Sequence, residues 1–169
     1  MDSDRALARL LAAMTAFDAG DPRRIQHFVK VHDLARAIGL LEGLDGKTLF
    51  TLEAAALVHD IAIRPCEAEL GRCNGKLQEE HGPMYARALL KELEFAPAVI
   101  DRVCWLVGHH HTYTDIQGLD HQILVEADFL VNLYEDNAPV SAVKTALERI
   151  FRTKAGTALG RDMFSLEEA

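Results

Sequence analysis

The chain has 169 residues, of which 49% are hydrophobic and 26% are charged, a composition typical of a globular protein with one domain, residues 1–169. Its formal net charge of −8 argues against a nucleic-acid polymer or an anionic membrane surface as the main partner. There is no run of 18 apolar residues and no signal-peptide pattern, and the three cysteines form no paired motif. We therefore expect a cytoplasmic protein with reduced thiols.

Helical periodicity recurs along the chain, and strand patterns are nearly absent. The predicted helices span about residues 4–18, 22–40, 48–62, 80–94, 96–110, 120–135, 139–152 and 156–164. Asp21 and Pro22 form a typical N-cap and first position of a helix. Residues 64–76 lack periodicity, which predicts a loop, and such loops are often functional. The sequence therefore predicts an all-α fold, a compact bundle of about seven to eight helices.

An adjacent histidine and aspartate follow the apolar stretch at residues 52–58. On a helix, His59 would share an inward face with Leu52 and Ala55. Asp60 would border that face, where a carboxylate costs several kcal/mol unless its charge is compensated. Either a buried hydrogen bond between the two side chains or a bound metal ion would compensate it.

Three more polar side chains lie on predicted inward faces of apolar helices. They are His27, His110 and Asp128, with His109 as the direct neighbour of His110. If each were buried alone, each would need its own hydrogen-bond partner. One metal site would satisfy them together with the His59-Asp60 pair. Imidazole and carboxylate are ligands for Zn, Mn, Fe or Ni, and cysteine is not required.

The remaining histidines have simpler explanations. His32 lies on the flank of its helix and is expected to be structural. His81 lies at the predicted start of a helix, and His111 is compatible with a solvated loop tip. His121 follows Asp120, the expected N-cap of the next helix, and is expected to be exposed.

In this order the residues resemble the H…HD…D signature of the HD-domain superfamily of metal-dependent phosphohydrolases. "HFVKV" is similar to the opening H-x-x-[RK]-V string, "AALVHDIA" to the A-x-L-x-H-D-I-[GA] core, and "EADFLVNL" to the A-D-x-L helix that supplies the last aspartate. The resemblance covers about residues 20–155. It implies a compact helical fold with a metal site at its centre.

The resemblance also implies a ligand set. The first metal would be held by His27, His59, Asp60 and Asp128. Asp60 would be the catalytic carboxylate and would bridge to a second ion, as in the H…HD…H…H…D variant of the family. The second ion would take its other ligands from His81 and from one or both of His109 and His110. The implied cofactor is one or two divalent ions, of Mn, Fe, Ni, Co or Zn, with Mg also compatible.

The activity implied by the resemblance is hydrolysis of a phosphomonoester or nucleotide by a metal-activated water. The expected partner is thus a small phosphorylated substrate, with Lys30, Arg24 and Arg64 as candidates to bind its phosphate oxygens. The sequence lacks the GYP motif of the cyclic dinucleotide phosphodiesterase branch. Two alternatives stay open: an HD-type di-iron oxygenase, and a non-catalytic, metal-stabilised ligand-binding module. Oligomeric state is not predicted.

Overall fold

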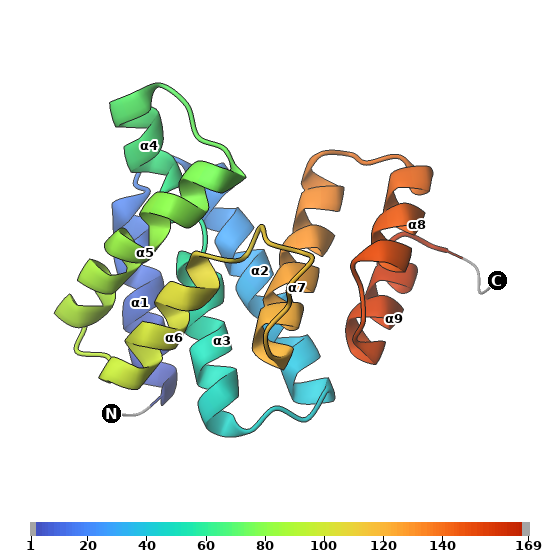
Figure 1. The fold of residues 1–169 in the computed structure, drawn as a ribbon, viewed down its shortest axis with the longest axis horizontal. Helices are drawn as coiled ribbons and strands as arrows, with labels where there is room; N and C mark the ends of the chain where they lie inside the picture. Colours follow the sequence, from blue (N-terminus) through green and yellow to red (C-terminus); the bar gives the residue numbers. More distant parts are fainter. Residues whose placement is uncertain (1–2, 167–169) are drawn as a thin grey trace.

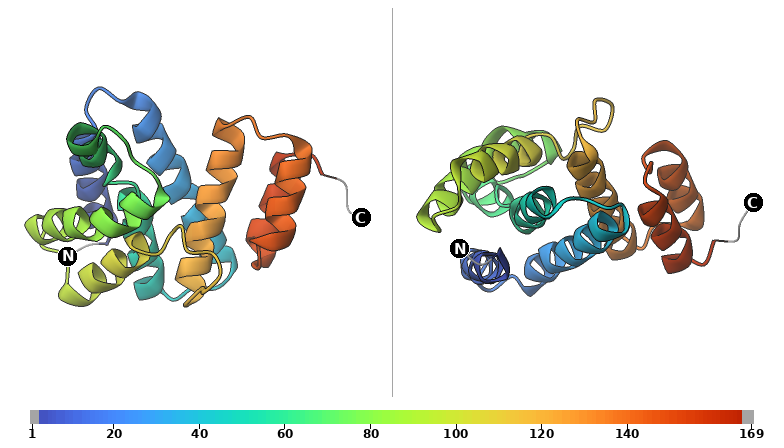
Figure 2. Two further views of the ribbon diagram at one scale, coloured as in Figure 1. Left: turned by 45° about the horizontal axis from the view of Figure 1, so that its top comes forward. Right: turned by 90° about the horizontal axis from the view of Figure 1, so that it is seen from below.

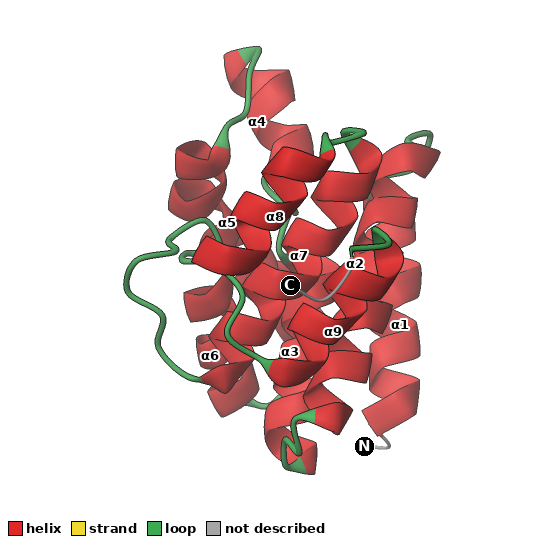
Figure 3. Ribbon diagram, turned by 90° about the vertical axis from the view of Figure 1, so that its right-hand side faces the viewer, coloured by secondary structure: helices red, strands yellow, loops and turns green. Residues whose placement is uncertain are grey.

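The computed structural model describes residues 3–166, and this part of the chain forms nine α-helices and no strand (Figures 1 and 3). The helices are α1 (Ser3–Phe17), α2 (Pro22–Leu41), α3 (Gly46–Val58), α4 (Ile63–Leu70), α5 (Gly75–Glu92), α6 (Pro97–Val107), α7 (Leu119–Glu135), α8 (Val140–Arg149) and α9 (Lys154–Met163). The predicted all-α class is confirmed. None of these helices has the length and hydropathy that a membrane crossing requires.

Helix α3 lies at the centre of the bundle, and every residue from Thr51 to Val58 is buried. Helix α2 packs against α3 on one side and against α7 on the other, while the α5–α6 pair packs against α3 through α6. Figure 2 shows α3 end-on between these layers. Helices α8 and α9 form a hairpin beyond α7 (Figure 1). A polar residue at the end of α3 therefore lies where several helices meet.

Helix α4 occupies residues that were predicted to be a loop, so that prediction is wrong. The helix has eight residues and no side-chain N-cap, and Cys66 is its single buried residue among those described. It ends at Gly71, which has a left-handed φ of 68°. So short a helix, with one inward side chain, leaves no periodic pattern to detect.

Side-chain caps set the start of two helices that matter for function. The backbone N–H of Arg24 donates to Asp21 Oδ1 at 3.0 Å, which confirms the predicted cap of α2. The N–H of Leu77 donates to Asn74 Oδ1 at 3.0 Å. Asn74 therefore starts α5 five residues before the predicted position, and His81 lies in its second turn instead of at its mouth.

The first turn of α7 is buried, against expectation. Asp120 is not the N-cap; it accepts two hydrogen bonds from Arg102, from Nη2 at 2.7 Å and from Nε at 2.8 Å. This paired contact holds the start of α7 against α6. As a result, His121 is fully buried beside Trp105, and its Nε2–H donates to the carbonyl oxygen of His109 at 2.8 Å. The prediction that His121 is exposed is wrong.

Two helical glycines allow a matched test of the α5–α6 packing. A Cβ atom added at Gly82 would lie 2.5 Å from Val107 Cγ1, whereas one added at Gly46 would meet nothing within 4 Å. We expect Gly82→Ala to lower the free energy of unfolding by about 1–3 kcal/mol, because overpacking outweighs the gain in helix propensity. Gly46→Ala should be neutral or slightly stabilising. Urea unfolding followed by circular dichroism measures both; equal stabilities would contradict the packing described.

Candidate metal centre

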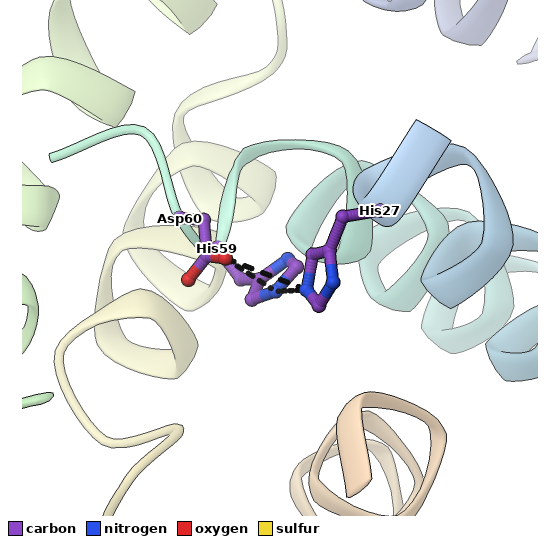
Figure 4. Close-up of side chains that lie close together, drawn as sticks. All are labelled: His27, His59 and Asp60. Carbon is purple, nitrogen blue, oxygen red and sulfur yellow. Dashed lines mark hydrogen bonds and ion pairs between the residues drawn. The ribbon is translucent and has the colours of Figure 1, made fainter. Parts of the chain in front are cut away.

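His59 and Asp60 lie in the turn that follows α3, because the helix ends at Val58. His59 is fully buried, and its Nδ1–H donates to the carbonyl oxygen of Ala56 at 2.8 Å. In the neutral ring this bond leaves a lone pair on Nε2, the usual arrangement of a histidine that binds a metal. The turn directs this nitrogen and one oxygen of the Asp60 carboxylate towards His27 on α2 (Figure 4).

His27 comes from α2 and Asp128 from α7, the two helices that pack around this turn. The Nδ1–H of His27 donates to Glu135 Oε2 at 2.9 Å, so Nε2 of the neutral ring again carries a lone pair. Asp128 accepts a hydrogen bond from Asn132 Nδ2 at 2.9 Å, which orients its Oδ1 atom. Each side chain is therefore held by a second group while one atom is left to face the centre.

Two nitrogens, Nε2 of His27 and Nε2 of His59, both face the Oδ2 atom of Asp60 and the Oδ1 atom of Asp128. The two nitrogens are 3.3 Å apart. Asp128 Oδ1 lies 3.2 Å from the nitrogen of His27 and 3.4 Å from that of His59. Asp60 Oδ2 lies 3.4 Å and 3.5 Å from the same two atoms. Ligands at about 2.0–2.2 Å from one ion, at angles of 90–109°, are separated by about 2.8–3.6 Å, so the residues fit a metal ion.

The charges at this centre favour a bound cation. Burial acts to lower the pKa of the His59 ring, but the carboxylates of Asp60 and Asp128 outweigh it and raise that pKa to about 9. Burial opposes the ionisation of Asp60, yet the nearby His59 lowers the pKa of its carboxyl to about 2. A proton or a metal ion satisfies the converging acceptors, so the two compete. Metal affinity should therefore fall as the pH falls below about 9.

A second group of potential ligands lies on the other side of Asp60. Its Oδ1 atom is 3.6 Å from Nε2 of His110, and the ligand atoms of Asp60, His110 and His111 all lie within 4.8 Å of one another. His110 is fully buried, and its Nδ1–H donates to the carbonyl oxygen of Val107 at 2.8 Å. The two oxygens of Asp60 thus face two different groups of ligands, as a bridging carboxylate requires.

The structure does not bring the expected His81 or His109 into either group. Nδ1–H of His109 donates to the carbonyl oxygen of Trp105 at 2.7 Å, and the two rings stack at 4.1 Å between centroids. His81 lies in the second turn of α5 and has no hydrogen-bond or ion-pair partner among residues 3–166. His111 lies beside His110 in the second group, where His109 was expected.

This difference has a local cause. Helix α6 ends at Val107 with Gly108 as its C-cap, so the three histidines that follow lie in a turn. Helical phase, which favoured positions 109 and 110, does not apply beyond the end of the helix. Sequence reasoning also missed Asn132 and Glu135, although both follow Asp128 on α7 at helical spacing, by four and seven residues.

A pocket of about 360 Å³ opens beside the first group of ligands. It is lined by Asp21, Arg23, Arg24, His27, Asp60, Ile63, Asn132 and Glu135. Of the predicted phosphate-binding residues, Arg24 lines this pocket, and the unpredicted Arg23 lines it too. Lys30 instead pairs with Glu135, Nζ to Oε1 at 2.6 Å, and Arg64 donates to the carbonyl oxygen of Ala19 at 3.0 Å.

Comparison with known proteins relates the chain to a protein family. The family model of the HD domain matches residues 24–147, a segment that contains all the residues of both ligand groups. The chain is also similar to a predicted HD superfamily hydrolase from an uncultured Thermotogales bacterium, known from a crystal structure. The two share 27% sequence identity, with a TM-score of 0.65 over 95% of this chain and 84% of that one. A comparison with curated proteins gave no match.

Proposed function

The chain belongs to the HD-domain family, a superfamily of metal-dependent hydrolases, and from this premise we propose that it hydrolyses a phosphomonoester or a nucleotide. The observation that carries the proposal is a pair of imidazole nitrogens 3.3 Å apart that face two carboxylate oxygens, each of which lies 3.2–3.5 Å from both nitrogens. Two of the four ligands are anionic, and no cysteine takes part. This donor set suits a divalent ion such as Mn, Fe, Co, Ni or Zn.

The first ion would be held by His27, His59, Asp60 and Asp128. The second would be held by the other oxygen of Asp60 together with His110 and His111. When bound, such ions lower the pKa of a coordinated water and polarise phosphoryl oxygens. The ligands themselves are held in place by contacts outside the centre, and outer contacts of this kind typically change metal affinity by about 10–100-fold.

The pocket supports a phosphorylated substrate. Arg24 lies beside the first ligand group and is only 15% exposed, and its Nη2 atom contacts Glu67 Oε2 at 3.1 Å. A guanidinium group can donate two parallel hydrogen bonds to phosphate oxygens. A phosphate that enters the pocket would compete with the half-exposed carboxylate of Glu67. It would also compete with Asp18 and Asp21, whose oxygens lie 3.9 and 3.5 Å from the same guanidinium group. Asn132 and Glu135 keep Asp128 and His27 oriented while the substrate is bound.

Phosphate release tests this function directly. Protein freed of metal by a chelator would be reloaded with Mn, Mg, Co, Ni, Zn or Fe and offered a panel of nucleotides and sugar phosphates. We expect phosphate release that needs added metal. Oxygen consumption by the iron-loaded protein, without phosphate release, would favour a di-iron oxygenase. Metal binding with neither reaction would favour a ligand-binding module, and both outcomes would contradict the proposal.

A further inference from the structure

The side chain of Gln78, in the first turn of α5, reaches the second group of ligands. Its Oε1 atom lies 3.1 Å from Nε2 of His110 and 2.9 Å from Nε2 of His111. The cap at Asn74 fixes the helix start that allows this reach. Gln78 is therefore the residue of α5 that faces this centre, three positions before His81.

The hydrogen bonds of these residues leave their lone pairs directed at a site that a cation could occupy. Because Nδ1–H of His110 donates to Val107, the Nε2 atom of a neutral His110 presents a lone pair. An amide oxygen also presents lone pairs, and Asp60 Oδ1 lies 3.6 Å from the same nitrogen. Three acceptor atoms, Oε1 of Gln78, Nε2 of His110 and Oδ1 of Asp60, therefore lie close together without a donor between them. A metal ion between them would satisfy all of these atoms at once.

His111 can join the same ion. Its Nδ1 atom lies 3.0 Å from the hydroxyl oxygen of Tyr113, which can accept the Nδ1 proton and leave Nε2 free to bind. Two contacts hold this residue against α5. Its backbone N–H donates to Glu79 Oε1 at 3.0 Å, and a Cβ atom at Gly75 would lie 2.9 Å from the His111 ring. The close approach of α5 to the turn after α6 thus depends on residues of both segments.

We propose that Gln78, through Oε1, is a neutral ligand of a second divalent ion in this chain, taking the role expected of His81. The proposal rests on the proposed function, since it assigns a ligand to the same centre. The separations of 2.9 and 3.1 Å match ligands at about 2.0–2.2 Å from one ion and about 90° apart. The other ligands of this ion are Asp60, His110 and His111.

The proposed ligand sets have different charges. Asp60 is shared, but the first ion also has the carboxylate of Asp128, whereas the second has the neutral amide of Gln78. The second ion therefore has one fewer negative ligand and should bind more weakly. We expect two ions per chain with separable affinities. The second ion should be the one that dissociates more readily.

An amide can also turn its NH2 group towards the two imidazoles, and the two orientations predict opposite results. In that orientation Gln78 would bridge His110 and His111 by hydrogen bonds and would occupy the space of the ion. Removing the side chain would then leave the affinity for the second ion unchanged or raise it. If Oε1 is a ligand, removing it lowers the affinity.

The test is a titration of metal-free protein with Mn²⁺, in which free Mn²⁺ is measured by electron paramagnetic resonance and bound metal by elemental analysis. We expect Gln78→Ala to lower the affinity for the second ion by at least about tenfold and to leave the affinity for the first ion unchanged. Gln78→Glu should restore tight binding, because a carboxylate supplies the same oxygen and adds a charge. His81→Ala, one turn along the same helix, is the matched control and should bind both ions like the wild type.

Several outcomes would overturn the role of Gln78. One is a Gln78→Ala protein that binds the second ion as well as, or better than, the wild type. Another is a His81→Ala protein that loses the second ion. A wild-type chain that binds a single ion would also overturn it but would leave the proposed hydrolase standing, whereas a chain that binds none would overturn both. Circular dichroism verifies folding, and Gln78→Glu keeps the test decisive if Gln78→Ala does not fold.

Discussion

Replacing Asp60 with asparagine should abolish nearly all metal-dependent hydrolysis and weaken the binding of both metal ions. The substitution removes a negative charge and turns one of two ligand oxygens into an NH2 group, although Oδ2 faces His27 and His59 and Oδ1 faces His110. Metal ions typically supply several kcal/mol of transition-state stabilisation. We therefore expect kcat/KM to fall by about a thousandfold or more.

The control for this substitution is Asp33→Asn on α2, where the side chain is 84% exposed. It should keep metal content and turnover unchanged. Elemental analysis after dialysis and the phosphate-release assay measure the two properties, and circular dichroism verifies that both variants are folded. An Asp60→Asn protein with two bound ions and normal turnover would show that the convergence around Asp60 is not a catalytic metal centre.

The second large effect concerns stability. Glu126 on α7 is fully buried and accepts hydrogen bonds from Gln122 Nε2 at 2.7 Å, from Arg152 N at 2.6 Å and from Thr153 N at 2.9 Å, and also contacts the Thr153 hydroxyl. Glu126→Ala would remove this acceptor from the buried N–H and hydroxyl of Thr153, at about 1–3 kcal/mol each, and from the N–H of Arg152. We expect the free energy of unfolding to fall by about 3–5 kcal/mol.

Glu148→Ala, at an exposed position of α8, is the matched control and should change stability by less than about 0.5 kcal/mol. Urea unfolding followed by circular dichroism measures both variants. A loss below about 1 kcal/mol for Glu126→Ala would mean that water can replace the carboxylate, and that Glu126 does not hold the α8–α9 hairpin to α7.

The residues that sequence analysis located best are those on regular helices. His27 and Asp128 face inward because they share a stripe with apolar neighbours, and this periodicity is visible without a structure. The resemblance added the order in which these residues and His59-Asp60 occur. Together they pointed to His27, His59 and Asp60, whose ligand atoms lie within 4.8 Å of one another in the structure. The helical class followed from the same periodicity.

The features of the site that sequence analysis did not locate depend on where helices end. Helix α3 stops at Val58, so the pair that follows it projects from a turn, and α6 stops before His109, so helical phase could not rank the neighbouring histidines. Gln78 could not be found by motif, because an amide in a polar first turn resembles any solvated residue. Its role appears only when the cap at Asn74 brings α5 against the loop after α6.

Two carboxylates on α7 have a mechanical consequence for the whole bundle. Glu126 and Asp128 are two residues apart, so they project about 200° from one another and contact opposite sides of the molecule. A one-residue slip of α7 would turn both by about 100° and break both sets of contacts at once. Apolar packing tolerates such slips more readily, since it has no direction. The pair thus fixes the rotational register of α7 and, with it, the position of the Asp128 carboxylate.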